Sequence, residues 1–408
     1  MKRVVVTGMS GVTALGSRWD EVEQGLRGLK NRVQFVPEWE KYAGLSTRLG
    51  APIAGFEVPP HYPRKKLRSM GRVSRLAVVA SEAALNDAGL LEHPIITSGR
   101  TGVAYGSSTG STEPFKAFGT MLNEYSTRGV TANSYIQMMS HTAAVNLALF
   151  FGATGRVITT SSACTSGSQG IGYAWEAIRH GYQTVMIAGG AEELCPTEVA
   201  VFDTLYATSV KNDQPSITPR PFDRDRDGLV IGEGAGTLIL EELEHALARG
   251  ATIHAELVGF GTNNDAQHVT QPTAETMQLA MELALESAAV DRSQIGYICA
   301  HGTATERGDI AESLATAALF GDRAAISSLK SYLGHTLGAC GAVESWMGIE
   351  MMKQGWFAPT INLETIDPAC GELDYLQGAG REMQCEYFMN NNFAFGGINT
   401  SLIFKRWS

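Results

Sequence analysis

Short β-branched runs alternate along the chain with longer segments of helical spacing. Val157–Thr160 is such a run, and it leads through small residues into a segment that carries Trp175 and Ile178. This order predicts a strand, a tight turn and a buried helix. Further strands are expected over Val4–Val6, Ile295–Ala300 and Ile326–Lys330, and further helices over Leu76–Leu90, Glu241–Arg249 and Thr336–Met352. The alternation predicts an α/β fold.

Three pairs of segments recur in the same order, about 165 to 195 residues apart. The pairs are Thr101–Gly110 with Ile298–Thr305, Gly236–Leu240 with Asn399–Phe404, and the helix after Cys164 with the segment after His335, where Trp175 and Trp346 each follow eleven residues on. Such recurrence indicates an internal duplication. We place the boundary near residue 250, with one half over residues 1–250 and the other over residues 251–408. No long linker separates them, so the halves are expected to form one body.

Length and composition narrow the class of protein. The 408 residues exceed the usual length for one core, and the 45 glycines suit many tight turns. No segment approaches about 18 uninterrupted apolar residues, and the chain starts with a short strand rather than a signal peptide, so we expect a soluble, cytoplasmic protein without a membrane span. The net charge of −10 argues against nonspecific nucleic-acid binding.

Neither a disulfide framework nor a nucleotide cofactor is indicated. The six cysteines show no C-x-x-C spacing, which also argues against a zinc site. Gly8, Gly11 and Gly16 follow the first strand, but their spacing differs from the dinucleotide fingerprint and no acid-ended strand follows about 20 positions later. We therefore expect reduced thiols and no bound cofactor.

Cys164 is the first candidate for chemistry. It stands where the predicted strand turns into the buried helix. Unpaired N–H groups and the helix dipole at that position favour an anion, so the thiol is expected to ionise near neutral pH and act as a nucleophile. The alternative is a packed cysteine that behaves as a small hydrophobe.

His301, Lys330 and His335 form a second group of candidates. Both histidines follow a predicted strand and are next to glycine and hydroxyl residues, and Lys330 ends the predicted strand Ile326–Lys330. Side chains at strand ends reach the cleft outside a sheet. Metal ligation by Cys164 and the histidines is the competing role, but no pair has the short spacing of a zinc site.

The segment Asn390–Asn399 places Phe393 and Phe395 beside Gly396 and Gly397. Packing would account for the phenylalanines. The Gly-Gly step also lets backbone N–H groups point into a site as oxyanion donors.

Residues 63–75 form the densest basic stretch of this acidic chain. It is either a solvated helix face or a docking patch for an acidic carrier.

Four motifs together resemble one enzyme family. They are Ala163-Cys164-Thr165-Ser166-Gly167, Ala300-His301-Gly302-Thr303-Ala304-Thr305, Lys330-Ser331-Tyr332-Leu333-Gly334-His335 and Asn392-Phe393-Ala394-Phe395-Gly396-Gly397-Ile398-Asn399. In order and spacing they resemble the β-ketoacyl-ACP synthases of the thiolase superfamily. The resemblance implies a duplicated βαβαβαββ fold in five layers, α-β-α-β-α, which agrees with the repeated segments.

The resemblance also implies a two-stage Claisen condensation. Cys164 takes an acyl group from an acyl carrier protein, with the backbone N–H groups of Cys164 and Phe395 as the oxyanion hole. Malonyl-ACP then loses CO₂ in fatty acid biosynthesis, and its enolate attacks the acyl-cysteine. His301 and His335 donate through Nε2 while mostly neutral, because developing negative charge needs aimed donors in a dry pocket.

Further roles follow from the same resemblance. Lys330 tunes the histidine environment, Thr303 and Thr305 bind the phosphopantetheine arm of the carrier, and Phe395 gates the acyl chain. Phe393 is assigned to the substrate pocket. The remaining implied features are a structural cation near Glu344, carrier docking at Lys65 and Arg68, and a homodimer or a heterodimer with a chain-length-factor-like subunit.

Three positions depart from the family pattern: Ala394 replaces a glycine, Ile398 a threonine and Glu306 a proline. An added methyl at Ala394 restricts a gate that depends on glycine's freedom. These changes fit a specialised polyketide or aryl-polyene-type ketosynthase with a chain-length-factor partner as well as housekeeping fatty-acid elongation.

Two other classes compete with this assignment. A noncatalytic chain-length-factor-like scaffold would lack the nucleophile that Cys164 supplies. A degradative thiolase would need a second cysteine within Asn390–Asn399, which has none, whereas a cysteine hydrolase would release free acid without malonyl-ACP.

Overall fold

One large twisted sheet runs through the molecule in the computed structural model, which describes residues 1–408. Its strand order is β13-β11-β10-β15-β16-β9-β1-β8-β6-β4-β5. The strands of the first half are β1 (Val4–Thr13), β4 (Thr101–Gly106), β5 (Val157–Thr160), β6 (Val185–Glu192) and β8 (Gly234–Glu242). Those of the second half are β9 (Ala255–Asn264), β10 (Ile295–Cys299), β11 (Ala325–Ser327), β15 (Tyr387–Phe393) and β16 (Ile398–Arg406), with the short β13 (Asp374–Tyr375) at the edge.

The two halves share one topology. Numbered from 1 to 5 within its half, each set of strands lies in the order 3-2-4-5-1. The first strands, β1 and β9, join the halves through only two residue pairs, Val5 with Glu256 and Val6 with Ala255. The recurring segments fall on equivalent elements, which are β4 and β10, β8 and β16, and the two central helices. The duplicated thiolase-like fold is therefore confirmed.

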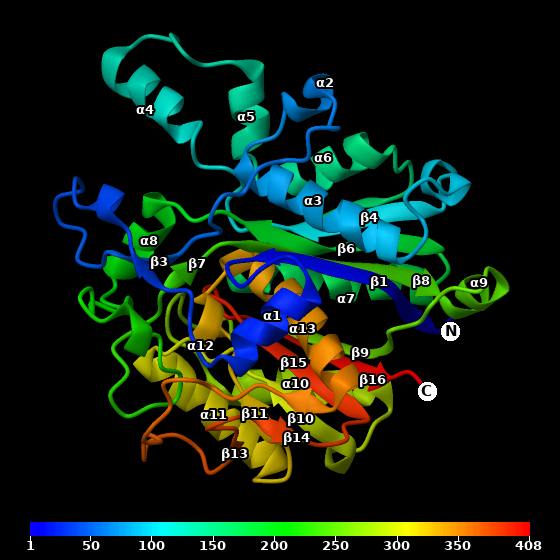
Figure 1. Cartoon of the computed structure of the whole chain (residues 1–408), viewed down its shortest axis with the longest axis vertical. Coiled ribbons are helices and arrows are strands. Elements are labelled where there is room, and N and C mark those ends of the chain that lie inside the picture. Colours follow the sequence, from blue (N-terminus) through cyan, green and yellow to red (C-terminus); the bar gives the residue numbers. More distant parts are fainter.

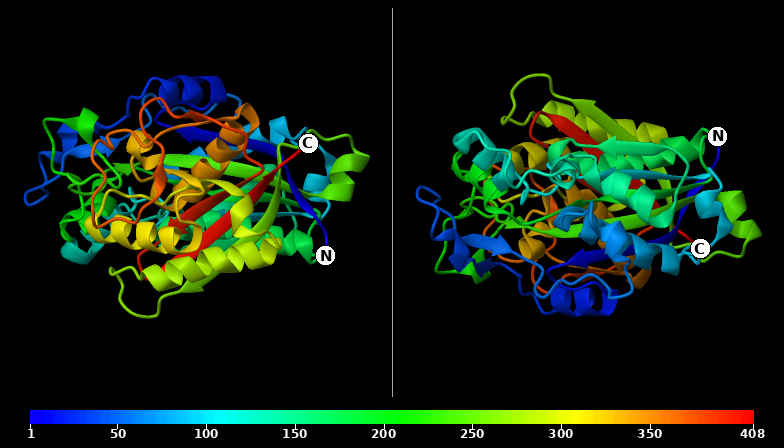
Figure 2. Two further views of the ribbon diagram at one scale, coloured as in Figure 1. Left: turned by 90° about the horizontal axis from the view of Figure 1, so that it is seen from below. Right: turned by 90° about the horizontal axis from the view of Figure 1, so that it is seen from above.

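Helices complete five layers, α-β-α-β-α (Figure 1). The helices of the repeated units are α3 (Arg72–Asp87), α6 (Thr142–Phe151) and α7 (Ser166–Arg179) in the first half, and α10 (Ala274–Ala288), α11 (Glu306–Phe320) and α13 (Cys340–Gln354) in the second. The two ends of the chain emerge on the same side of the body (Figure 2).

The central layer consists of α7 and α13, which are apolar on most of their surfaces because one half of the large sheet covers each side. Trp175 and Trp346 lie in the largest buried cluster, which joins side chains of both halves of the sheet to these helices. Close packing demands glycine here: a Cβ on Gly167 would lie 2.8 Å from the carbonyl oxygen of Gly338. The N-terminal ends of both central helices are thus brought together.

The remaining elements are insertions and connections. Their helices are α1 (Trp19–Arg27), α2 (Arg64–Leu67), α4 (Phe115–Glu124), α5 (Ala132–Met138), α8 (Pro196–Asp203), α9 (Leu243–Ala248) and α12 (Lys330–Leu333). The short strands are β2 (Gln34–Phe35), β3 (Leu49–Ala51), β7 (Ile231–Gly232), β12 (Trp356–Phe357) and β14 (Arg381–Glu382). Helices α4 and α5 form an arm that projects from the body in Figure 1. None of the helices has the length and apolar character needed to cross a bilayer.

Several predicted boundaries are wrong by a few residues. The strand expected to deliver Lys330 ends at Ser327, and Lys330 begins α12 instead. The helix expected from Thr336 starts as a 3₁₀ turn over Leu337–Ala339 before α13. Tertiary contacts at the centre of the molecule decide these ends, and the apolar pattern does not resolve them.

Candidate active site

Cys164 lies in a 3₁₀ turn, Ala163–Thr165, between β5 and α7. Ala163 has a φ of 51°, in the left-handed region that alanine rarely adopts. Two hydrogen bonds of Ser166 hold this corner: the Ser162 N–H donates to Ser166 Oγ at 3.0 Å, and that hydroxyl donates to the Ala163 carbonyl at 2.7 Å. The thiol is thereby fixed at the start of a central helix, where the helix dipole favours negative charge.

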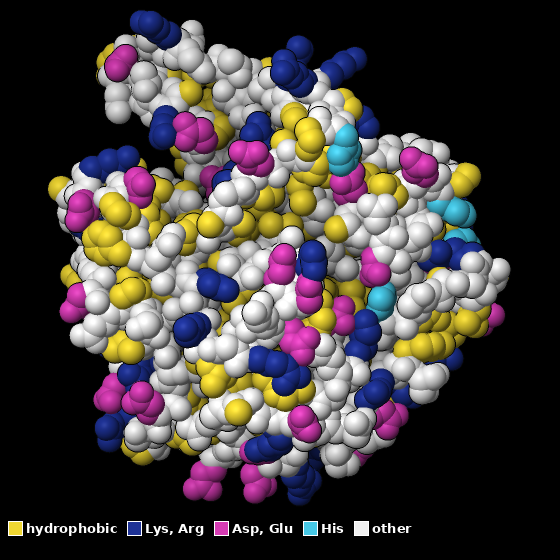
Figure 3. Space-filling model, in the orientation of Figure 1, with side chains coloured by type: hydrophobic (Ala, Val, Ile, Leu, Met, Phe, Trp, Pro, Cys, Tyr) yellow, Lys and Arg dark blue, Asp and Glu magenta, His cyan; other side chains and the backbone are white.

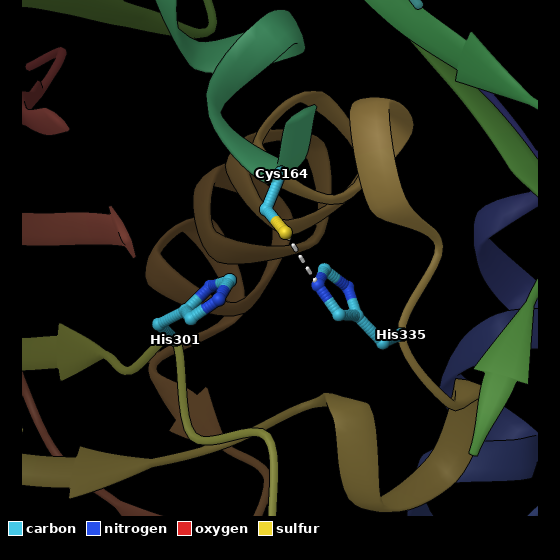
Figure 4. A group of neighbouring side chains, drawn as sticks. All are labelled: Cys164, His301 and His335. Atoms are coloured by element: carbon cyan, nitrogen blue, oxygen red, sulfur yellow. Dashed lines mark hydrogen bonds between the residues drawn. The ribbon is translucent and has the colours of Figure 1, made fainter. Parts of the chain in front are cut away.

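His335 contacts the sulfur directly (Figure 4). Its Nε2 lies 2.9 Å from Cys164 Sγ, and its Nδ1 accepts the backbone N–H of Leu337 at 3.2 Å. An imidazole that accepts at Nδ1 carries its proton on Nε2 when neutral. The Nε2–H group of His335 therefore donates to the sulfur.

His301 approaches from the other side of the sulfur, and its ring stands nearly perpendicular to that of His335, with centroids 5.1 Å apart. Its Nδ1 is buried without a hydrogen-bond partner. The His301 and Gly302 N–H groups each donate to Glu312 at 2.7 Å. Asp309 accepts the N–H groups of the next two residues at 3.0 and 3.1 Å. The carboxyl groups of two α11 side chains thus hold the loop that presents His301.

Both imidazoles are neutral near pH 7. Burial lowers the pKa of His301 and of His335 well below the usual value, and the nearby Lys330 ammonium lowers both further. A neutral ring can donate a hydrogen bond without bringing a permanent charge into the site. This is the protonation state that the resemblance implied.

The predicted ionisation of Cys164 near neutral pH is wrong for this arrangement. Burial raises the pKa of its thiol to about 12, although Lys330 and the backbone N–H groups of Phe395 and Cys164 act in the opposite direction. The free-energy cost of removing a thiolate from water is larger than the stabilisation that these groups provide. The two N–H groups expected as the oxyanion hole do face the sulfur.

Lys330 and Glu344 form a buried ion pair beside the histidines, with Nζ 2.5 Å from Oε1. Burial alone would lower the pKa of Lys330, but the Glu344 carboxylate outweighs it and the pKa is raised, so the ammonium stays charged. Asn392 donates to the other Glu344 oxygen at 2.8 Å. Both carboxylate oxygens thus have protein partners, and the structural cation near Glu344 stays a prediction.

A cavity of about 490 Å³ leads from the surface to the cysteine. Cys164, His301 and His335 line it together with Thr303, Thr305, Phe393 and Phe395, and the exposed Glu306 stands at its rim. The hydroxyl oxygens of the two threonines are 2.9 Å apart. The Phe395 ring packs on Phe202 of α8 with centroids 5.0 Å apart. An extended substrate could therefore reach the sulfur past two hydroxyl groups and an aromatic pair.

Comparison with known proteins identifies the family of this chain. Residues 1–246 match the family model for the beta-ketoacyl synthase N-terminal domain, and residues 254–364 match that for the C-terminal domain. The chain belongs to the beta-ketoacyl synthase family. The family assignment made from the motifs is confirmed, and the chain is a condensing enzyme of the 3-oxoacyl-[acyl-carrier-protein] synthase type.

Full-length relatives support the assignment. This β-ketoacyl synthase is 39% identical to 3-oxoacyl-[acyl-carrier-protein] synthase 2 of Vibrio cholerae, with 99% of each chain covered. Its sequence is 64% identical to that of a beta-ketoacyl synthase from Burkholderia phymatum whose crystal structure is known. The two structures align over the full length of both chains with a TM-score of 0.99. A structure described as the ishigamide ketosynthase/chain length factor is 30% identical, with full coverage of both chains and a TM-score of 0.91.

The predicted docking residues of this β-ketoacyl synthase lie apart from the cavity at Cys164. Lys65 belongs to α2 and Arg68 follows that helix; both are exposed and neither lines the cavity. Basic side chains gather over α2 at the top of Figure 3. Their role in carrier docking stays a prediction.

The Cys-His-His group of this synthase does not fit a metal well, although its three ligand atoms lie within 4.8 Å of one another. Ligation through His335 Nε2 would need a lone pair there, and Nδ1 would then carry the proton. The Leu337 N–H already points at Nδ1, so that tautomer would set two hydrogens against each other.

The sequence pattern assigns no role to Asp309, Glu312 or Phe202. The two acids are one helical turn apart at the start of α11, and both are fully buried. That spacing puts them on one face of the helix, but two acids on a solvent-exposed face would have the same spacing in the sequence. Only the fold shows that backbone N–H groups donate hydrogen bonds to both side chains.

Proposed function

We propose that Cys164 is the acyl acceptor of this condensing enzyme. Its sulfur attacks the thioester carbonyl of an acyl carrier protein, the bond between the acyl group and the carrier sulfur breaks, and the departing carrier thiolate takes the thiol proton. The N–H groups of Cys164 and Phe395 stabilise the oxyanion formed on the way. This exchange of thiol for thioester needs no net ionisation, which fits a thiol whose pKa is about 12.

Condensation follows when malonyl-ACP enters. Its carboxylate leaves as CO₂, and the electron pair of the broken carbon–carbon bond forms an enolate. His301 and His335 donate hydrogen bonds to the enolate oxygen. The enolate carbon attacks the acyl carbonyl on Cys164, the carbon–sulfur bond breaks, and the released thiolate takes up one proton. The products are 3-oxoacyl-ACP and CO₂.

The hydrogen bond between His335 Nε2 and Cys164 Sγ, at 2.9 Å, carries this proposal. With Nδ1 accepting from Leu337, His335 is a donor aimed at the position where the thioester must bind. A general base would present a lone pair there instead. The arrangement therefore favours enolate stabilisation over proton abstraction.

We assign the cavity to the phosphopantetheine arm by which the acyl carrier protein brings its acyl group to Cys164. Thr303 and Thr305 offer hydroxyl groups to the amides of the phosphopantetheine arm, and no bound cofactor is required. Lys65 and Arg68 are the proposed docking residues, and their exposed positive charges suit an acidic carrier protein.

A dimer is supported by one edge of the sheet. Strand β5 pairs only with β4, and its first residue, Val157, is 44% exposed. Large apolar side chains are also exposed on and beside the α4–α5 arm: Phe115, Leu122, Tyr125 and Tyr135. Open strand edges and exposed apolar surface are typical of interfaces. We assign this face to a second copy or to a chain-length-factor-like subunit.

A specialised polyketide or polyene ketosynthase is the second candidate. The full-length likeness to the ishigamide ketosynthase/chain length factor favours it, whereas the name of the Vibrio cholerae relative favours fatty-acid elongation. Mass spectrometry of the acyl group trapped on Cys164 in cells that hold the native carrier would separate the two.

The reaction itself is tested with purified carrier substrates. Wild-type enzyme given acyl-ACP and malonyl-ACP is expected to release CO₂ and form 3-oxoacyl-ACP, and Cys164→Ala is expected to accept no acyl group. Free acid released without malonyl-ACP would instead indicate hydrolysis. Absence of both products across a wide range of acyl primers would refute the proposal.

A further inference from the structure

The side chain of Glu192, the last residue of β6, is fully buried. Its Oε2 accepts the Gly338 N–H at 3.1 Å, the Ser108 N–H at 2.7 Å and the Ser108 hydroxyl at 2.5 Å. Its Oε1 accepts the Ser107 hydroxyl at 2.8 Å. One side chain of the first half thus holds a backbone turn of the second half, and the chemistry proposed above does not use it.

The turn it holds is the one that orients His335. Leu337 has a φ of 46°, a left-handed conformation that a leucine adopts only when its surroundings impose it. In that conformation the Leu337 N–H points at His335 Nδ1. The next N–H along the chain, that of Gly338, is bound by Glu192. The carboxylate is therefore one residue away from the group that sets the tautomer of His335.

Space around this contact is tight. A Cβ built on Gly338 would lie 2.7 Å from Glu192 Oε2 and 2.8 Å from the Ser108 nitrogen. Such distances are too short for a side chain, so the turn cannot keep this position with a larger residue.

The same carboxylate is also linked to the cysteine side of the site. The Ser108 carbonyl accepts the hydroxyl of Ser161 at 3.1 Å, three residues before Cys164. Glu192 is thereby connected by hydrogen bonds both to the loop before Cys164, through Ser108, and to the turn after His335, which belongs to the other half of the chain.

We propose that Glu192 is a positioning residue for condensation: it fixes the Leu337–Gly338 turn and, through it, the Nε2–H group of His335 that faces Cys164. The inference rests on the donor role of His335 proposed above. Its neighbour Glu193 offers a matched control, because Glu193 is also buried but accepts the N–H and hydroxyl of Thr112 and has no hydrogen bond to the turn.

The test separates two steps in the full-length enzyme. Release of CO₂ from malonyl-ACP by the acylated enzyme reports the histidine donors, and alkylation of Cys164 by iodoacetamide at a fixed pH reports the thiol. The variants are Glu192→Ala, Glu192→Gln, Glu193→Ala and Gly338→Ala, with thermal unfolding as the check on folding. His335→Ala is measured alongside.

Glu192→Ala is expected to slow CO₂ release about 100-fold, because a misplacement of about 1 Å costs that much in an oriented site. Alkylation should not slow, since the charge of Glu192 raises the pKa of the Cys164 thiol and the variant removes it. Glu192→Gln, whose amide oxygen can still accept from Gly338 and Ser108, should recover most of the CO₂ release.

Gly338→Ala should reproduce the loss of CO₂ release through a different change, and Glu193→Ala should stay within about threefold of wild type because it leaves the turn in place. Equal losses in Glu192→Ala and Glu193→Ala, or a parallel loss of alkylation, would overturn the positioning role. So would full activity in a folded Glu192→Ala enzyme. Normal CO₂ release by His335→Ala would instead overturn the proposed role of His335.

Discussion

Replacing His301 by alanine tests the two-donor arrangement most directly. In the structure His301 makes no hydrogen bond to the cysteine, whereas His335 does. Removing His301 therefore leaves the pair of Cys164 and His335 intact and takes away one of the two proposed donors to the enolate. Loss of a single oxyanion donor costs about 2.7 to 4 kcal/mol, or about 10²- to 10³-fold in rate. Acyl transfer to Cys164 should change far less.

The assay measures the two half-reactions on the same enzyme sample. Transfer of an acyl group from acyl-ACP is followed by the mass of the protein, and CO₂ release is followed from labelled malonyl-ACP. His180→Ala is the control, because His180 lies at the far end of α7 from Cys164 and is exposed. A loss of CO₂ release smaller than about tenfold in His301→Ala, or an equal loss of acyl transfer, would refute the division of roles.

Three further predictions concern the buried charges of the site. Lys330→Met should lower the free energy of unfolding by about 3 to 5 kcal/mol in urea titrations, because Glu344 would keep a buried charge without a partner. The double variant that also carries Glu344→Gln should recover most of this loss of stability. No recovery would contradict the pairing of the two side chains. Burial raises the pKa of Glu312 to about 8, so the native state holds a proton that the unfolded state loses above its ordinary pKa of about 4.3. Unfolding free energy should therefore fall as pH rises between those two values, and Glu312→Gln should flatten that fall. Iodoacetamide should react with Cys164 faster as pH rises to 10 and beyond, in line with a thiol pKa of about 12; a plateau below pH 8 would show a thiolate in the resting enzyme.

Local pattern was enough to predict much of this protein. The β-branched run before Cys164 and the apolar helix after it are properties of neighbouring residues, and β5 and α7 lie where that pattern predicts them. Recurrence of such patterns predicted the duplication, and five strands and the central helix of one half have counterparts in the other. The motifs around Cys164, His301, Lys330 and His335 were likewise sufficient to identify the family.

The sequence by itself thus determined the elements, their repetition and the residue types that we propose carry the chemistry. Only the tertiary structure brought Cys164 within 2.9 Å of a histidine 171 residues away, and only it placed the thiol where burial raises its pKa to about 12. The tautomer of His335 depends on Leu337, and the loop of His301 depends on Glu312, through hydrogen bonds that no periodicity records. The physical reason is that local propensity depends on neighbours in the chain, whereas burial, pKa and hydrogen bonding depend on which surfaces meet when two halves close over one central layer.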